Sequence, residues 1–146
     1  MDVDVSPLRK LLGSIFGGKN QADRVLQEFQ RHRQELQENC IAIASTQDKP
    51  RGLRWTNCEW LDSFALVEDP STRILTLFCG VNLSFEAIEG GDMEDVEAVS
   101  MVRDATAVFH HQNQRWGTGG RVLFNMTPMS AAELVATGQT MLKNSG

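Results

Sequence analysis

Apolar side chains recur at helical spacing in the first third of the chain. They are Ala22, Val25, Leu26, Phe29, Leu36, Cys40 and Ile43. Steps of three and four residues place such side chains on one face of an α-helix, while charged residues occupy the other face. The pattern therefore predicts one long amphipathic helix from about residue 21 to the low 40s.

After Pro50 the pattern changes to that of β-strands. Residues 53–67 are rich in apolar and aromatic β-formers and predict one bent strand or two short ones. An Asp-Pro pair at residues 69–70 predicts a reversing turn. In residues 75–87 every odd position is apolar, and this alternation predicts a long strand with one buried face.

A second long alternating segment follows an acidic stretch. Its apolar odd positions are Val99, Met101, Ala105, Ala107 and Phe109, and Arg103 interrupts them. Because the apolar faces of paired strands must coincide, residues whose numbers sum to 184 are expected to pair, which sets Cys79 beside Ala105. The tip of this hairpin then falls at about residues 90–94.

The last third predicts a further hairpin and a helix. Residues 111–126 hold Trp116, Val122, Phe124 and Met126 in phase, with glycines that suggest a bulge. Thr127-Pro128, or Ser130 with Glu133, would cap a C-terminal helix that Gly138 weakens. The predicted class is α+β: an N-terminal long helix, an antiparallel meander of about five strands, and a C-terminal helix packed on one sheet face.

Glycines at positions 13, 17 and 18 predict a hinge that divides the chain. Residues 1–19 form an N-terminal arm, flexible or amphipathic, and residues 20–146 form a single α+β domain. The apolar residues of the arm, among them Leu11 and Phe16, lie near Arg9 and Lys10. The arm could dock on a membrane or a partner, or pack on the domain, and both alternatives stand.

Composition excludes several classes of protein. The 146 residues are 41% hydrophobic and 23% charged, as in an ordinary globular domain, with a net charge of −5. A nucleic-acid partner is not expected, because phosphate backbones bind basic surfaces. No apolar run approaches the ~20 residues of a transmembrane segment. The acids ahead of the first apolar cluster are unlike a signal peptide, so we expect a cytoplasmic protein.

No cofactor or metal ion is expected. Cys40, Cys58 and Cys79 are widely spaced and form no CxxC pair, so we interpret them as reduced, mostly buried thiols. The glycines of residues 117–120 lack the following helix and lysine of a phosphate-binding loop, and they are interpreted as turn glycines.

Residues 84–99 form an acidic segment. It contains Glu86, Glu89, Asp92, Glu94, Asp95 and Glu97, and no Lys or Arg occurs from Ile74 through Val102. A solvated hairpin tip explains most of this charge, since the pattern of a calcium loop is absent and neighbouring carboxylates on a strand face opposite sides. Crowded carboxylates also attract cations. Glu86, Glu94 and Glu97 are therefore ligand-binding candidates.

Three further residues are binding candidates. Arg103 would lie on an apolar face opposite Val81, so it must either reach a carboxylate or turn to solvent through a bulge. The second is His110, since it and His111 face opposite sides of a strand and only one of them can serve a site. Trp116 anchors the core or lines a cleft between sheet and helix.

The sequence favours a small acidic binding or adaptor module without catalytic residues. Recognition would use the sheet face and the acidic hairpin 84–99. The partner would be a protein or a small molecule, and a basic partner is favoured by charge. A homodimer is one further hypothesis. The alternative is a small hydrolase or isomerase that uses Glu and Asp of the two long strands, with or without a divalent metal. A pocket between sheet and helix would favour the enzyme, and an exposed apolar face the adaptor.

Overall fold

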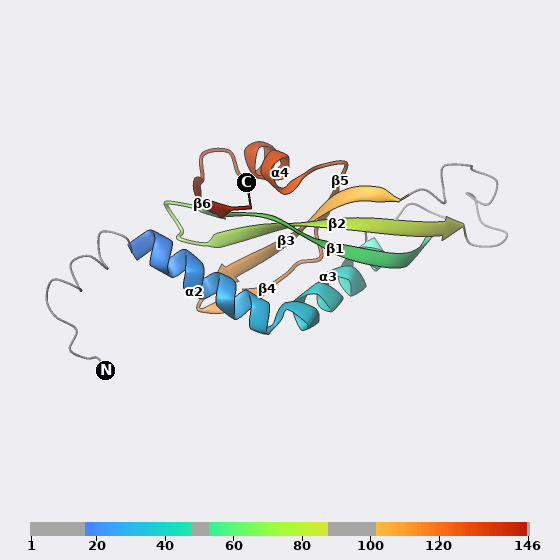
Figure 1. The fold of residues 1–146 in the computed structure, drawn as a ribbon, viewed down its shortest axis with the longest axis horizontal. Coiled ribbons are helices and arrows are strands. Elements are labelled where there is room, and N and C mark those ends of the chain that lie inside the picture. Colours follow the sequence, from blue (N-terminus) through green and yellow to red (C-terminus); the bar gives the residue numbers. More distant parts are fainter. Residues whose placement is uncertain (1–16, 48–52, 88–101, 146) are drawn as a thin grey trace, which may run out of the picture.

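The computed structural model describes residues 17–47, 53–87 and 102–145, and it confirms the α+β class (Figure 1). Its helices are α2 (Gly17–Arg31), α3 (Arg33–Gln47) and α4 (Pro128–Val135). Its strands are β1 (Leu53–Glu68), β2 (Leu75–Ala87), β3 (Arg103–Gln112), β4 (Arg115–Gly117), β5 (Val122–Phe124) and β6 (Thr140–Asn144).

The strands form one antiparallel sheet in the order β4-β3-β2-β1-β6, and β5 pairs with β3 beside β4. β1 is one bent strand with irregular pairing between Trp55 and Asn57 and between Trp60 and Phe64. The turn that leads into β2 is the expected one, since the carboxylate of Asp69 accepts a hydrogen bond from the amide of Ser71 at 2.8 Å.

The predicted register of the two long strands was wrong by two residues. Residues of β2 and β3 pair where their numbers sum to 186, as in Leu77 with Phe109 and Cys79 with Ala107. A shift of two leaves every side chain on its own face of the sheet, so alternation alone cannot distinguish the two registers. The ladder is regular from Leu75 to Leu83, and Arg103 therefore lies opposite Leu83 instead of Val81.

The expected long helix is present as two consecutive helices. α2 begins at Gly17, inside the stretch expected to be a hinge, and the helix is interrupted at His32. The His32 amide is shared between the carbonyls of Glu28 at 3.3 Å and Phe29 at 3.1 Å. This tightened turn lets the helical path bend over the twisted sheet.

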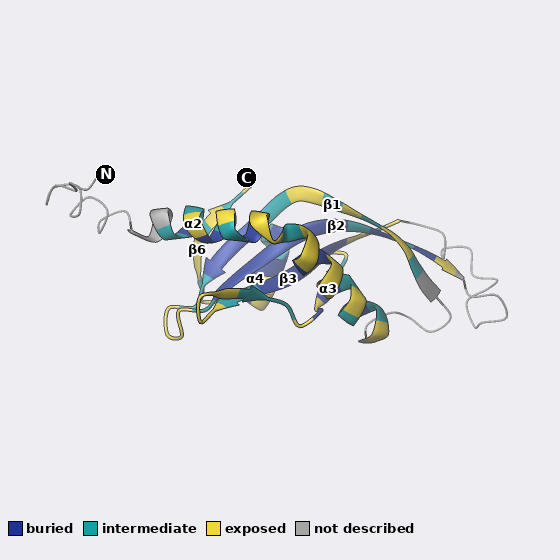
Figure 2. Cartoon of the chain, turned by 90° about the horizontal axis from the view of Figure 1, so that it is seen from below, coloured by how far each residue is buried: buried dark blue, intermediate teal, exposed yellow. Residues whose placement is uncertain are grey.

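Helices lie on both faces of the sheet and enclose two cores. α2 and α3 cover one face, where Phe29, Leu36 and Cys40 pack on the odd-numbered residues of β2 (Figure 2). α4 lies on the other face, where Ala131, Ala132 and Ala136 pack on Ala65, Val67, Phe78 and Val108. Alternation along β2 thus supplies apolar side chains to both cores.

The C-terminal segment corrects a second expectation. Thr127 caps α4 as predicted, since its hydroxyl accepts a hydrogen bond from the amide of Ser130. The helix ends at Val135 instead of continuing toward residue 144, and Gly138 adopts a φ of 86°. Such a left-handed glycine terminates a helix, and residues 140–144 then pair with β1 as the unpredicted strand β6.

None of the helices in the described ranges is long and apolar enough to cross a membrane. The expected hairpin tip at residues 90–94 lies outside the described residues, and so do the candidates Glu94 and Glu97.

Candidate functional site: a groove between helices α2–α3 and strand β4

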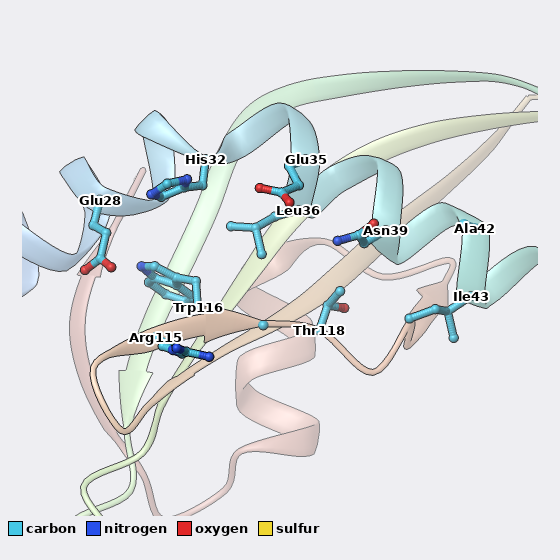
Figure 3. A pocket seen from close by; sticks show the side chains of 11 residues that line it. Glu28, His32, Glu35, Leu36, Asn39, Ala42, Ile43, Arg115, Trp116 and Thr118 are labelled. Atoms are coloured by element: carbon cyan, nitrogen blue, oxygen red, sulfur yellow. The ribbon is translucent and has the colours of Figure 1, made fainter.

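A groove of about 660 Å³ runs between the α2–α3 junction and β4. This volume lies in the usual range of ligand sites. Figure 3 shows Glu28, His32, Glu35, Leu36, Asn39, Ala42 and Ile43 along the helical wall, with Arg115, Trp116 and Thr118 opposite. We call this cavity the α2–β4 groove.

The polar residues of the helical wall lie on one side of the helices. Positions 28, 32, 35 and 39 follow one another by four, three and four residues, which is the spacing of a single helical stripe. Glu35 and Asn39 are exposed, whereas Leu36 is buried beneath them. A ligand on this wall would therefore contact polar side chains at the solvent-facing edge and the apolar Leu36 deeper in the groove.

Trp116 forms the base of the groove and is held rigidly. Its indole Nε1 donates a hydrogen bond of 2.8 Å to the carbonyl of Val25 in α2. Its ring meets Phe29 and His111 edge to face, with centroid distances of 5.2 Å in both pairs. A half-buried tryptophan fixed on three sides leaves its remaining face as a ready surface for a cation or an apolar group.

A tight hairpin sets the position of β4. Asn113 and Gln114 have φ values of 53° and 63°, as two-residue turns of the twist-compatible type require. β4 therefore returns directly along β3, where Trp116 pairs with His111 and Gly117 with His110. The turn thus places Arg115 and Trp116 opposite the helical stripe.

The rim of the groove beyond β4 is almost bare backbone. A Cβ atom at Gly117 or Gly119 would meet no other atom within 4 Å, so both positions border open space. Thr118 between them is fixed, since its hydroxyl donates to the carbonyl of Val108 at 3.0 Å. β4 also stands at one end of the strand order, so among the described strands no partner covers its outer edge.

Two carboxylates give the groove a negative side. Glu28 lies 3.7 Å from Nε2 of His111, and the exposed Glu35 lies farther along the same wall. Arg115 is the opposing charge on the β4 side. A ligand with a positive side chain beside an apolar stem would find carboxylates, an aromatic face and Leu36 within one cavity.

The β4 rim also borders a second cavity of about 460 Å³, lined by His110, Gln112, Asn113 and the residues from Arg115 to Gly119. His110 Nδ1 lies 3.2 Å from the hydroxyl of Thr76. Burial, and secondarily the positive charge of Arg121, lower the pKa of His110 below its usual value of 6.5. His110 is therefore neutral near pH 7, and the cavity there carries no positive charge from it.

The candidates from the sequence fall at two separate places. His110 and Trp116 lie together near β4. Arg103 is at the start of β3, seven residues from His110 along the strand, or about 23 Å at the rise of a β-strand. Glu86 is exposed near the end of β2, on the sheet face opposite that of Arg103.

Arg103 meets neither of the two expectations in full. The ladder at Arg103 is regular, so no bulge turns it to solvent, and its side chain is half-buried beside the sheet end. No hydrogen bond or ion pair joins Arg103 to a carboxylate in the described parts of the chain. At the end of a strand a long side chain can extend along the apolar surface and keep its charge in water.

The sequence interpretation missed the polar groove residues of the helical wall, which are Glu28, His32, Glu35 and Asn39. Their helical spacing was a usable signal, because it marks a polar stripe that also includes a histidine. Charged residues on a helix usually face solvent, so the stripe became informative only once β4 was known to lie opposite.

Metal clusters and thiol nucleophiles are two kinds of catalytic centre that the described residues can be checked for. No three His, Cys, Asp or Glu side chains among them are placed to hold a metal ion. Cys58 is half-buried and Cys79 is buried, and burial raises the pKa of both thiols, that of Cys79 to about 12. Neutral thiols are poor nucleophiles, so neither provides an activated thiolate.

Comparisons of the chain with protein-family models, with curated proteins and with solved structures gave no match.

Proposed function

We propose that this chain is a binding module without catalytic activity, and that it holds an extended peptide with a Lys or Arg side chain in the α2–β4 groove. The observation that carries the proposal is the fixed Trp116 ring between two carboxylates and an uncovered strand edge. The basic side chain would lie against Trp116 and between Glu28 and Glu35. The net charge of −5 adds a long-range attraction for a positive partner.

The backbone of the peptide would follow the rim of β4. An extended segment that pairs with a sheet edge directs alternate side chains to the two sides of the sheet. Here residues 115–118 line both the α2–β4 groove and the 460 Å³ cavity. The bare Gly117 and Gly119 would leave room for the peptide backbone.

The enzyme alternative draws less support. The described parts of β2 and β3 carry two carboxylates, Glu86 and Asp104, and both are exposed. General acids and bases usually lie in cavities where burial or charge shifts their pKa values. The groove lies between sheet and helices, but its carboxylates are on α2 and α3 instead of the long strands.

A selection from a random nine-residue peptide library, with the full chain as bait, tests the proposal. Enriched peptides should carry Lys or Arg among β-forming residues. The double variant Glu28→Gln, Glu35→Gln should bind these peptides about tenfold more weakly, since two partly exposed ion pairs are lost.

The matched control is Glu38→Gln with Glu133→Gln. Both residues are exposed and lie outside the groove, on α3 and α4, so the change in net charge is the same. The control should bind as the native chain does. Equal losses in the two double variants would reduce the effect to overall charge and refute a specific groove.

A further inference from the structure

A different cavity lies on the other side of the α2–α3 junction. It has a volume of about 280 Å³ and is lined by residues of α2, α3, β1, β2 and β6. Its apolar lining consists of Leu26, Phe29, Leu61, Phe64, Leu77 and Cys79. It shares no lining residue with the α2–β4 groove, so an inference about it is independent of the proposed function.

The irregular pairing of β1 shapes this cavity. Between Trp60 and Phe64 three residues of β1 stand opposite the single residue Gly80 of β2. A Cβ at position 80 would meet the hydroxyl of Ser63, so a side chain there would require Ser63 to move. The bulge places Leu61 and Asp62 at the mouth of the cavity.

The charged side chains at the mouth differ in how freely they could bind a ligand. Lys143 is bound by Asp23 at 2.6 Å and is largely neutralised. Asp62 is exposed to solvent. Arg33 is half-buried, and no hydrogen bond or ion pair within the described ranges neutralises its guanidinium. A half-buried cation beside an apolar cavity favours an anionic group of a ligand.

The interior offers no competing charge. Cys79 is buried, and desolvation raises the pKa of its thiol to about 12, so it stays neutral and behaves as a small apolar group. Phe29 is 2% exposed and Leu77 is 1% exposed, which gives the cavity a firm apolar base. Arg33 is less solvated than Asp62 at the mouth, and together with the apolar base it favours an amphipathic anion.

We infer that this cavity binds a carboxylate carried on a short apolar chain, with the carboxylate at Arg33 and the chain against Phe29, Leu77 and Cys79. The planar guanidinium matches a carboxylate in geometry. The volume of about 280 Å³ is just below the usual range of ligand sites, so the apolar chain must be short. The same chemistry occurs in a free fatty acid and in an apolar residue at the C-terminus of a peptide.

Calorimetric titration of the full chain with octanoate, octan-1-ol and octylamine tests the charge preference without any mutation. Octanoate should bind about tenfold more tightly than the alcohol, and the amine should bind least, because only the carboxylate pairs with Arg33. Octanoate that binds no better than octan-1-ol would overturn the inference, and so would the absence of any binding.

Two variants locate the effect. Arg33→Met should weaken octanoate binding about tenfold and leave the binding of octan-1-ol unchanged. Arg31→Met removes the same charge two residues away, from an exposed side chain outside the cavity, and should change neither. If both variants weaken octanoate binding equally, the carboxylate is not held at Arg33 and the inference fails.

A final comparison distinguishes the two sources of the ligand. N-acetyl-leucyl-leucine with a free carboxylate is titrated beside its C-terminal amide. If the dipeptide binds as the free carboxylate and not as the amide, the site accepts peptide C-termini as well as fatty acids. If octanoate binds and the dipeptide does not, the site is specific for fatty acids. Both results support the inference, and preference for the amide would contradict it.

Discussion

At the scale of single residues, burial decides what the chemically versatile side chains can do. His110 is half-buried next to Thr76 and near Arg121, and its pKa is lowered by burial first and by Arg121 second. Burial thus opposes protonation of His110 when the pH falls.

Lowering the pH from 7.5 to 5.5 should destabilise the native chain partly through His110. Its folded pKa is below the unfolded value of 6.5, so the unfolded state binds more protons as the pH falls through that value. Stability contributed by neutral His110 is complete above pH 6.5 and is lost below it. Urea denaturation at several pH values should therefore give a shallower pH dependence for His110→Gln than for the native chain.

Sequence patterns could identify Trp116 as a cleft candidate because aromatic residues in alternating strands belong to an interior or its edge. They could not show that Glu28 and His32 lie opposite it, since this depends on which face of the sheet the helices cover and on the break at His32. Those are tertiary relations, and a helical stripe of polar residues looks the same in either case.

At the scale of elements, α3 is held close to the loop between β4 and β5 by one glycine. Gly120 has a φ of 78°, and a Cβ there would collide with the side chain of Ile43 in α3. The amide of Gly120 also donates to the hydroxyl of Thr118 at 3.0 Å. The loop and the helix therefore approach one another closely only because this position has no side chain.

Gly120→Ala should lower the free energy of unfolding by about 2 kcal/mol, because it combines a left-handed φ with overpacking against Ile43. Gly119→Ala is the matched control, since its Cβ would meet open space. Urea denaturation monitored by circular dichroism gives both values. Equal stability of the two variants would show that α3 does not depend on this contact.

Elements with a long regular alternation were predictable, and the end of the chain was not. Residues 75–87 have the period of a strand, and β2 occupies them. Residues 128–144 combine a sound helix cap with a segment that alternates only briefly, so the helix was extended through Gly138. The pairing of β6 with β1 is a long-range contact, and local pattern carries little information about it.

At the scale of the whole molecule, β6, the last described strand, contacts both the first described strand β1 and the first described helix α2. It pairs with β1 from Ala65 to Glu68, Leu142 packs against the core under α2, and Lys143 binds Asp23 of α2. These contacts differ in strength. Removing apolar surface from water stabilises the fold in proportion to the buried area, whereas water and salt screen the attraction within an exposed ion pair.

Leu142→Ala should lower the free energy of unfolding by about 2 kcal/mol, through lost burial and an incompletely filled space. Lys143→Met should change it by less than about 0.5 kcal/mol, since both side chains of the Lys143–Asp23 pair are 43% exposed. Thermal and urea unfolding of both variants provide the comparison. A larger effect of Lys143→Met would mean that the ion pair, and not apolar packing, secures β6.

The position of β2 between two cores has a consequence for how the sequence can diverge. Every residue from Leu75 to Val81 is buried, with odd positions under α2 and α3 and even positions such as Phe78 under α4. Any substitution in this part of β2 changes a buried residue, whereas β1 includes exposed positions such as Thr56 and Glu59. Descendants of this chain should therefore drift fastest along β1 and on the outer faces of the helices, and β2 should keep its ancestral residues longest.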